Sequence, residues 1–322
     1  MDLRPSSAPE GQSASDSGNA DSGTRSAARV APRGYGRPGS LAEYLPSTAE
    51  PIDRWFQAAN ASNVRTTTAI IADLCEWPPA YVVDPFAGSG SAAVVARLLG
   101  VPFYGIELDP VLACVTIAKA LAREAHALNG FPPAEGRDAL VSGCLGLVDE
   151  IARQTQGSAL PPSFRQDART PGAPVHERTA TVQGDASATE CWSHITPPPG
   201  HGVLYTSPPF GPSSPRVQVD AGLRARARDL LDGHGMLHVP SPGGAGSAAY
   251  ADLVVAVLRR AEKLGPLTAI IEHEPPDDGR DDRAQIADRI LADTSAELVA
   301  VRETRAYSRR GLLSLFVCEV TG

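Results

Sequence analysis

The amino-acid sequence predicts an α/β fold built on a mostly parallel, doubly wound sheet of seven strands that ends in an antiparallel hairpin. Two observations predict it. From residue 81 onward, short β-branched or aromatic runs alternate with amphipathic or alanine-rich stretches, which is the pattern of strands joined by helices. The last two β-rich runs, 298–307 and 312–320, are separated by only four residues. A connection that short requires antiparallel pairing.

The first half of the pattern begins with apolar positions at helical spacing and continues with a β-branched run before an alanine-rich stretch. In chain order it predicts helix 64–76, strand 81–84, helix 91–99, strand 103–108, helix 111–128 and helix 137–153. The second half repeats the alternation, with an Arg-rich helix expected inside 211–249. It predicts strand 181–184, helix 187–194, strand 203–207, helix 250–264, strand 267–272, helix 281–293 and the hairpin strands 298–307 and 312–320.

Composition divides the chain into a tail and one domain. Residues 1–40 are rich in Ser, Gly, Ala, Pro and charged residues, with almost no large apolar side chain, so this tail is expected to be disordered. Residues 41–322 form the expected domain, in which scattered apolar anchors such as Trp55 and Phe56 pack against its edge. Insertions near 129–178 and 211–249 interrupt the strand–helix pattern, and both are too short for an independent DNA-reading domain.

Charge and cysteine content restrict the classes of partner. The formal net charge of −8 argues against tight, indiscriminate binding to nucleic acid, which depends on neutralising phosphates. The five cysteines are scattered without a C-x-x-C pair, so neither a metal site nor a disulfide framework is expected. The polar N-terminus and the lack of a run of about 20 apolar residues predict a cytoplasmic protein without a membrane span.

A glycine loop follows the first predicted strand, in the sequence Asp84-Pro85-Phe86-Ala87-Gly88-Ser89-Gly90. Gly88 and Gly90 lack a Cβ and adopt positive φ freely, so the backbone can lie against a ligand. On its own, such a loop is as often an ordinary strand–turn–helix junction. Glu107 ends the second predicted strand 17 positions after Gly90, close to where this kind of fold places a carboxylate for a ribose.

A second loop follows the fourth predicted strand, in the sequence Thr206-Ser207-Pro208-Pro209-Phe210. The two prolines fix φ, so the Pro208 carbonyl is oriented before a substrate arrives. The Ser207 hydroxyl lies beside it in sequence, and Phe210 offers an aromatic face. Alone, this loop would be a rigid surface turn.

Together and in this order, the two loops resemble those of S-adenosylmethionine-dependent amino-methyltransferases that modify exocyclic nitrogens of DNA bases. The resemblance covers about 64–322 and implies a seven-stranded, Rossmann-like class I methyltransferase sheet with S-adenosyl-L-methionine as cofactor. The family's separate recognition domain has no counterpart here. A nicotinamide dehydrogenase also carries a glycine loop and a ribose carboxylate, but the Asp-Pro-Phe start and the Pro-Pro loop disfavour it.

The resemblance also implies a role for each motif residue. The methyl donor is expected to contact the glycine loop and three carboxylates: the ammonium group at Asp84, the ribose at Glu107 and the adenine amino group at Asp185. The loop contacts are Phe86, Gly88 and Gly90. An alternative role for Asp185 is to cap the helix predicted at 187–194.

The acceptor is expected to contact Ser207, Pro208, Pro209 and Phe210. Ser207 Oγ and the Pro208 carbonyl accept the two N–H bonds of an amine, and Phe210 stacks on a base swung out of its helix. In this family, serine at the head of the loop favours cytosine N4 over adenine N6. The resemblance therefore implies DNA as the partner and cytosine N4 as the acceptor. Two alternatives stay open: a methyltransferase acting on RNA or on a nitrogen of a protein, peptide or small metabolite, and a non-catalytic regulator that binds only the donor.

Overall fold

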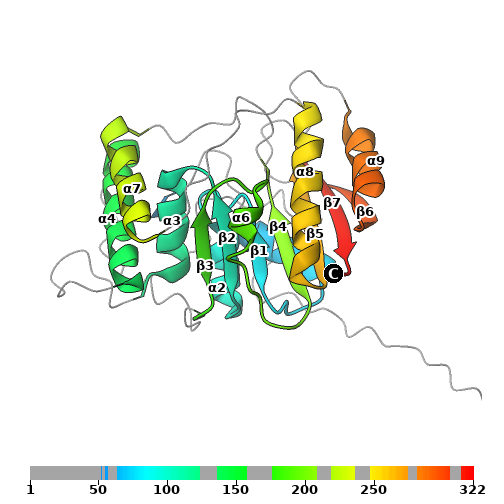
Figure 1. Cartoon of the computed structure of the whole chain (residues 1–322), viewed down its shortest axis with the longest axis horizontal. Coiled ribbons are helices and arrows are strands. Elements are labelled where there is room, and N and C mark those ends of the chain that lie inside the picture. Colours follow the sequence, from blue (N-terminus) through cyan, green and yellow to red (C-terminus); the bar gives the residue numbers. More distant parts are fainter. Residues whose placement is uncertain are drawn as a thin grey trace, which may run out of the picture.

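A computed structural model describes residues 52, 55–56, 64–123, 136–157, 176–208, 219–235, 247–274, 281–304 and 313–322. Seven strands form one sheet in the order β3-β2-β1-β4-β5-β7-β6 (Figure 1). They are β1 Val82–Asp84, β2 Phe103–Glu107, β3 Ala180–Gln183, β4 Gly202–Thr206, β5 Leu267–His273, β6 Glu297–Thr304 and β7 Leu313–Val320. Strands β1 to β5 pair in parallel, whereas β7 is antiparallel to both β5 and β6. The predicted fold class is confirmed.

Helices cover both faces of the sheet, and each face has its own hydrophobic cluster of strand and helix residues. Val82 belongs to one cluster and Val83 to the other, so β1 is apolar on both sides. The described helices are α1 Val64–Leu74, α2 Ser91–Leu99, α3 Pro110–Leu121, α4 Arg137–Gln156, α6 Thr189–Trp192, α7 Ala221–Gly233, α8 Ser247–Ala261 and α9 Arg283–Asp293, with a 3-10 turn η4 Glu262–Leu264. α1, α2 and α3 contribute to the cluster on one face, and α6, α8 and α9 to the cluster on the other. α4 and α7 pack against α3 at the end of the molecule shown on the left in Figure 1.

Local sequence explains where two of these helices begin. Asp109 caps α3 by accepting a hydrogen bond from the Val111 amide at 2.8 Å, and Pro110 occupies the first helical position. Asp220 caps α7 in the same way, through the Leu223 amide at 2.7 Å. α7 is the Arg-rich helix expected within 211–249.

Two helix predictions are corrected. The helix expected over 111–128 ends at Leu121, and Ala122 has an extended backbone with φ −60° and ψ 136°. Alanine is among the best helix formers, so composition carries no signal for this break. The helix expected over 187–194 is only Thr189–Trp192, and its N-cap is Ala188.

A short segment before the first helix is fixed to the domain core. Ile52 and Trp55 are fully buried, and Phe56 is almost so. The ammonium group of the buried Lys119 in α3 donates a hydrogen bond to the Phe56 carbonyl at 2.6 Å. Trp55 and Phe56 therefore belong to the domain core, whereas the sequence predicted that they pack against the edge of the domain.

No helix in the part of the chain that the structure describes has the length and apolar content to cross a lipid bilayer.

Candidate active site

The predicted site residues gather at the edge of the sheet where the parallel strands end. Asp84 is the last residue of β1, Glu107 of β2 and Thr206 of β4. β1 lies between β2 and β4, so these three residues come from adjacent strands. In open α/β sheets, ligands bind beyond the carboxyl ends of strands, where the strand order reverses. The order of this sheet reverses between β1 and β4.

The Gly88 peptide is held on both sides. Its N–H donates to Glu107 Oε2 at 2.7 Å, and its carbonyl accepts from Thr116 Oγ1 in α3 at 3.0 Å. Gly88 has φ +54°, a conformation that glycine adopts without strain. At Gly90, with φ +82°, an added Cβ would lie only 3.2 Å from the Thr116 Cα. The loop therefore lies close against α3 and needs glycine at both positions.

Glu107 contacts the glycine loop directly. Its side chain is 9% exposed, and besides the Gly88 amide it accepts the Asp109 amide on Oε1 at 2.8 Å. Burial raises the pKa of Glu107 to about 7, although the hydrogen bonds from Asp109 and Gly88 act in the opposite direction. The carboxylate predicted to hold a ribose thus also shapes the loop beside it.

Asp84 links the two predicted loops. Its Oδ1 accepts the Phe86 amide at 3.1 Å and the Thr206 hydroxyl at 2.9 Å. The residue is 6% exposed, and burial raises its pKa to about 7, with a further upward contribution from the negative charges of Glu107 and Glu272. The start of the glycine loop is therefore bonded to the last residue of β4.

A third buried carboxylate, Glu272, lies near the end of β5. The Tyr205 hydroxyl donates to Glu272 Oε1, and burial holds the pKa of Tyr205 well above its usual range. Tyr205 and Thr206, the last two residues of β4, are thus each bonded to a carboxylate of a neighbouring strand. Sequence reasoning missed Thr116, the Tyr205–Glu272 contact and the role of Thr206. Only Thr206 gave a signal, since it begins the second motif.

Asp185 follows β3 at the same edge of the sheet. Its Oδ1 accepts both the amide of Ser187 at 2.8 Å and the Ser187 hydroxyl at 2.7 Å. Since α6 begins after Ala188, Asp185 is not the cap of that helix, and this alternative is corrected. Among the described residues, the hydrogen bonds of the Asp185 side chain go to Ser187 and not to the glycine loop.

Part of the second motif lies within the described residues. Ser207 is half-buried and Pro208 buried, directly after the end of β4. Pro209 and Phe210 lie outside the described residues, so their roles stay predictions. Phe86, from the first motif, is half-buried and packs against the hydrophobic cluster on the face of α6 and α8.

Two nearby residues have structural partners that explain their position. His273 is 3% exposed, binds Asp282 Oδ1 through Nε2 at 2.7 Å and lies against the Tyr250 ring, with the two ring planes tilted by 47°. Burial lowers the pKa of His273. Arg224 in α7 forms an ion pair with Asp109 at the start of α3. Both residues are thereby held within the fold.

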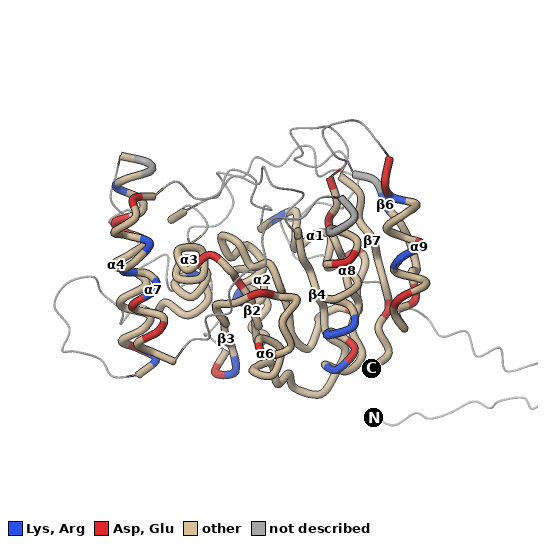
Figure 2. Tube along the Cα trace, turned by 45° about the horizontal axis from the view of Figure 1, so that its top comes forward, with Lys and Arg blue, Asp and Glu red and all other residues tan. Residues whose placement is uncertain are grey.

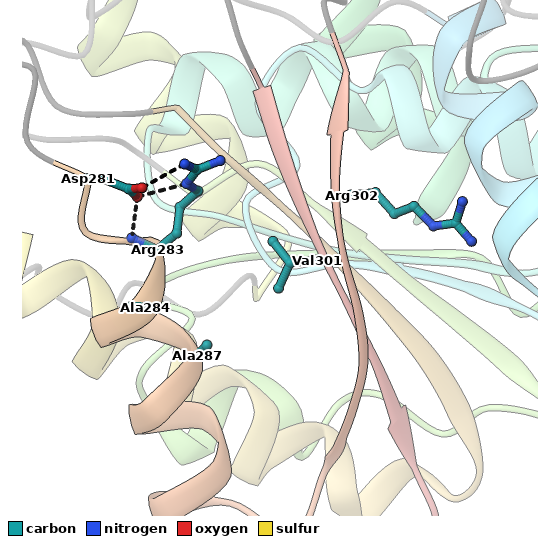
Figure 3. Close-up of a pocket in the computed structure, with 6 residues that line it drawn as sticks. All are labelled: Asp281, Arg283, Ala284, Ala287, Val301 and Arg302. Carbon is teal, nitrogen blue, oxygen red and sulfur yellow. Dashed lines mark hydrogen bonds and ion pairs between the residues drawn. The ribbon is translucent and has the colours of Figure 1, made fainter.

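A separate cavity of about 560 Å³ lies between α9 and β6 (Figure 3). Asp281 and Arg283 form an ion pair at this cavity, which is also lined by Val301 and Arg302. It holds none of the predicted site residues. Among the described residues, no group of three or more His, Cys, Asp or Glu side chains could hold a metal ion.

Comparison with known proteins gave similarity to solved structures only. No protein-family model and no curated protein matches the chain. TrmN from Thermus thermophilus is 17% identical, with 80% of this chain and 49% of that chain covered and a TM-score of 0.38. A "possible methylase" from Clostridium difficile 630 is 11% identical, with 83% and 55% covered and a TM-score of 0.39. The chain thus spans about half the length of these two proteins.

Magnesium protoporphyrin IX methyltransferase from Synechocystis PCC 6803, solved with bound S-adenosylmethionine, is 10% identical. The similarity covers 84% of this chain and 90% of that chain, with a TM-score of 0.33. Similarity at this level assigns neither a reaction nor a substrate to this chain.

Proposed function

We propose that the chain is an S-adenosylmethionine-dependent N-methyltransferase that acts on an exocyclic amino nitrogen of a DNA base. One observation carries the proposal. The glycine loop after β1 and the Ser207-Pro208 loop after β4 leave the same edge of the sheet, and the Asp84–Thr206 hydrogen bond of 2.9 Å joins their starting points. A methyl transfer needs its donor and acceptor sites side by side in this way.

The residues at the glycine loop fit a cationic donor. Asp84 and Glu107 are buried carboxylates whose pKa values lie at about 7, so each would gain from a positive charge placed beside it. S-adenosylmethionine supplies an electrophilic methyl on a positively charged sulfur and also carries an ammonium group. Asp84 would hold the ammonium group and Glu107 the ribose hydroxyls. Gly88 and Gly90 would let the backbone approach the ligand, because neither residue has a Cβ.

Asp185 and Phe86 complete the proposed donor site. Asp185 follows β3, the strand beside β2, and would accept the adenine amino group. Phe86 would offer an apolar surface at the mouth of the loop.

The acceptor loop would act on the lone pair of the amine. An exocyclic amino nitrogen is a poor nucleophile because its lone pair is delocalised into the ring. Ser207 Oγ and the Pro208 carbonyl would each accept one N–H, drawing the nitrogen towards a tetrahedral geometry and freeing its lone pair. The nitrogen would attack the methyl carbon as the carbon–sulfur bond breaks, S-adenosylhomocysteine would leave, and the methylated amine would lose one proton to solvent. Pro209 would fix the aim of the Pro208 carbonyl, and Phe210 would stack on the base. Serine at position 207 favours cytosine N4 over adenine N6.

A second acceptor class is RNA, or an amide or amine nitrogen of a protein, peptide or small metabolite. The net charge of −8 favours the members of this class that carry no phosphate backbone, namely a protein, a peptide or a small metabolite. Figure 2 shows acidic and basic positions mixed along α4 and α7, so these described helices present no continuous basic stripe for a duplex.

Labelled methyl transfer tests the proposal and separates these acceptors. The protein is incubated with S-adenosylmethionine carrying a labelled methyl group and with duplex DNA, RNA or a protein extract. Digestion and mass spectrometry then identify the modified nucleoside or residue. We expect N4-methylcytosine in DNA. Label in RNA or protein alone would favour the second acceptor class.

Donor binding and methyl transfer, each measured on the wild-type protein and on one variant, define the result that would overturn the proposal. Calorimetry should detect donor binding by the wild-type protein, and the Ser207→Ala, Pro208→Ala double variant should bind the donor while losing transfer. Absence of donor binding would exclude the methyltransferase. Donor binding without transfer to any pool would favour the non-catalytic regulator.

A further inference from the structure

Thr206 and Asp84 form a hydrogen bond where the hydrogen-bonded ladder between their strands stops. The parallel register of β1 and β4 runs from Val82 opposite Val203 to Val83 opposite Leu204. Just beyond it, Thr206 Oγ1 donates to Asp84 Oδ1 at 2.9 Å, joining residues 122 positions apart in the sequence. Thr206 is 1% exposed, so this contact is sheltered from water.

We infer that Thr206 is a positioning residue that sets the acceptor loop in register with the donor loop. The inference rests on the function proposed above. Thr206 touches neither substrate in this scheme, because Ser207 and Pro208 make the acceptor contacts. Its hydroxyl acts through Asp84, the residue from which the donor loop starts.

The division of hydrogen bonds at Asp84 supports this role. The same oxygen, Oδ1, accepts the Phe86 amide of the donor loop and the Thr206 hydroxyl. In the described part of the chain, no hydrogen bond engages Oδ2, which leaves that oxygen for the ammonium group of the donor. Oδ1 of Asp84 thus orients both loops, while Oδ2 would bind the ammonium group of the donor.

The end of β4 is fixed from both neighbouring strands. Thr206 is bonded to Asp84 of β1, and Tyr205 to Glu272 of β5. The Ser207 backbone begins one residue later, so its direction follows from how Thr206 is held. Transfer requires the reacting atoms within about 3–3.5 Å of each other in line, and a displacement of about 1 Å can cost roughly a hundredfold in rate.

Removal of one hydroxyl tests the inference. Thr206→Val keeps the shape of the side chain and leaves Asp84 its bond to Phe86, whereas Thr206→Ser keeps the hydroxyl. Thr268→Val is the control, because Thr268 is equally buried and its hydroxyl bonds Glu319 and His201 at the opposite edge of the sheet, where the parallel strands begin. Measurements are made at about pH 9, well above the wild-type Asp84 pKa of about 7, because loss of the Thr206 hydrogen bond, which lowers this pKa, would otherwise leave more of the carboxyl group protonated.

The dissociation constant for the donor and the single-turnover transfer rate together separate a positioning role of Thr206 from a merely structural one. The wild-type assay first shows which of duplex DNA, RNA or protein extract accepts the methyl group, and that pool is used throughout. For Thr206→Val we expect the dissociation constant for S-adenosylmethionine to stay within about twofold and the single-turnover transfer rate to fall about tenfold or more. Thr206→Ser should recover most of that rate, and Thr268→Val should lose little.

Several results would overturn the inference while leaving the proposed function intact. They are an unchanged transfer rate in Thr206→Val, an equal loss of donor affinity and rate, or the same loss of rate in Thr268→Val. A wild-type protein that binds no donor or labels no pool would instead overturn the catalytic function, and the inference with it.

Discussion

At the scale of single residues, the buried carboxylates Asp84 and Glu107 make stability depend on pH. Burial raises the pKa of each to about 7, above the value of about 4 for an exposed carboxyl group. Each therefore contributes stability that is fully present below about pH 4 and is lost as pH rises through about 7. Each unit of pKa shift corresponds to about 1.4 kcal/mol, so the loss is on the order of a few kcal/mol.

The Asp84→Asn, Glu107→Gln double variant, in which neither side chain ionises, checks the predicted loss of stability with rising pH. Urea unfolding of the donor-free proteins should show wild type losing stability relative to the variant between about pH 4 and pH 8. A difference that is flat, or that grows in favour of wild type with rising pH, would contradict the assignment. A cationic donor should act in the opposite sense, because it favours the ionised carboxylates, so donor affinity should increase over the same range.

Gly90 and Gly100 separate the effect of backbone strain from the effect of the site. Both have positive φ, +82° and +68°, but a Cβ at Gly90 would lie 3.2 Å from Thr116, whereas nothing lies within 4 Å at Gly100. Alanine costs about 1–2 kcal/mol of strain at either position. We expect Gly90→Ala to lose additional stability and to weaken donor binding at least about tenfold. Gly100→Ala, with its donor affinity unchanged, is the control in calorimetry.

At the scale of elements, the start of α3 connects helix stability to the site. Asp109 caps this helix, pairs with Arg224 and offers its amide to Glu107. Asp109→Ala should cost about 0.5–2 kcal/mol, as should Asp220→Ala at the cap of α7. Only Asp109→Ala should also weaken donor binding, because its segment orients Glu107. Equal donor affinities in the two variants would show that the first turn of α3 does not support the site.

Strands β1, β2, β4 and β5 could be predicted from sequence because each is a compact apolar or aromatic run that is buried throughout. The glycine loop and the Ser207-Pro208 loop could be located because each follows such a run. The contact between Asp84 and Thr206 could not be predicted, since it joins positions 122 residues apart and depends on β4 lying beside β1. The strand order and the break after Leu121 had no local signal either. Local composition thus predicted elements and loops, whereas pairings came from the tertiary structure.

At the scale of the whole molecule, the chain before α1 divides into two parts whose deletion should change the stability of the protein by different amounts. A chain beginning at Leu41 should melt within a few degrees of the full sequence, because residues 1–40 offer little apolar surface. A chain beginning at Gln57 should be strongly destabilised, since it loses the buried Ile52 and Trp55 and the carbonyl bound by Lys119. Loss of one buried Trp side chain costs about 3–5 kcal/mol. Calorimetric melting of both chains checks this, and similar melting temperatures would contradict it.

The place of β7 has a consequence for synthesis. β7 is the last strand in the sequence, yet it lies between β5 and β6 and not at the edge of the sheet. While the ribosome is still making β7, β5 has one open edge and β6 has no strand to pair with. Unpaired strand edges invite association between chains. The nascent protein should therefore depend most on chaperones before β7 has been made, and a ribosome stalled ahead of Leu313 should carry an aggregation-prone chain.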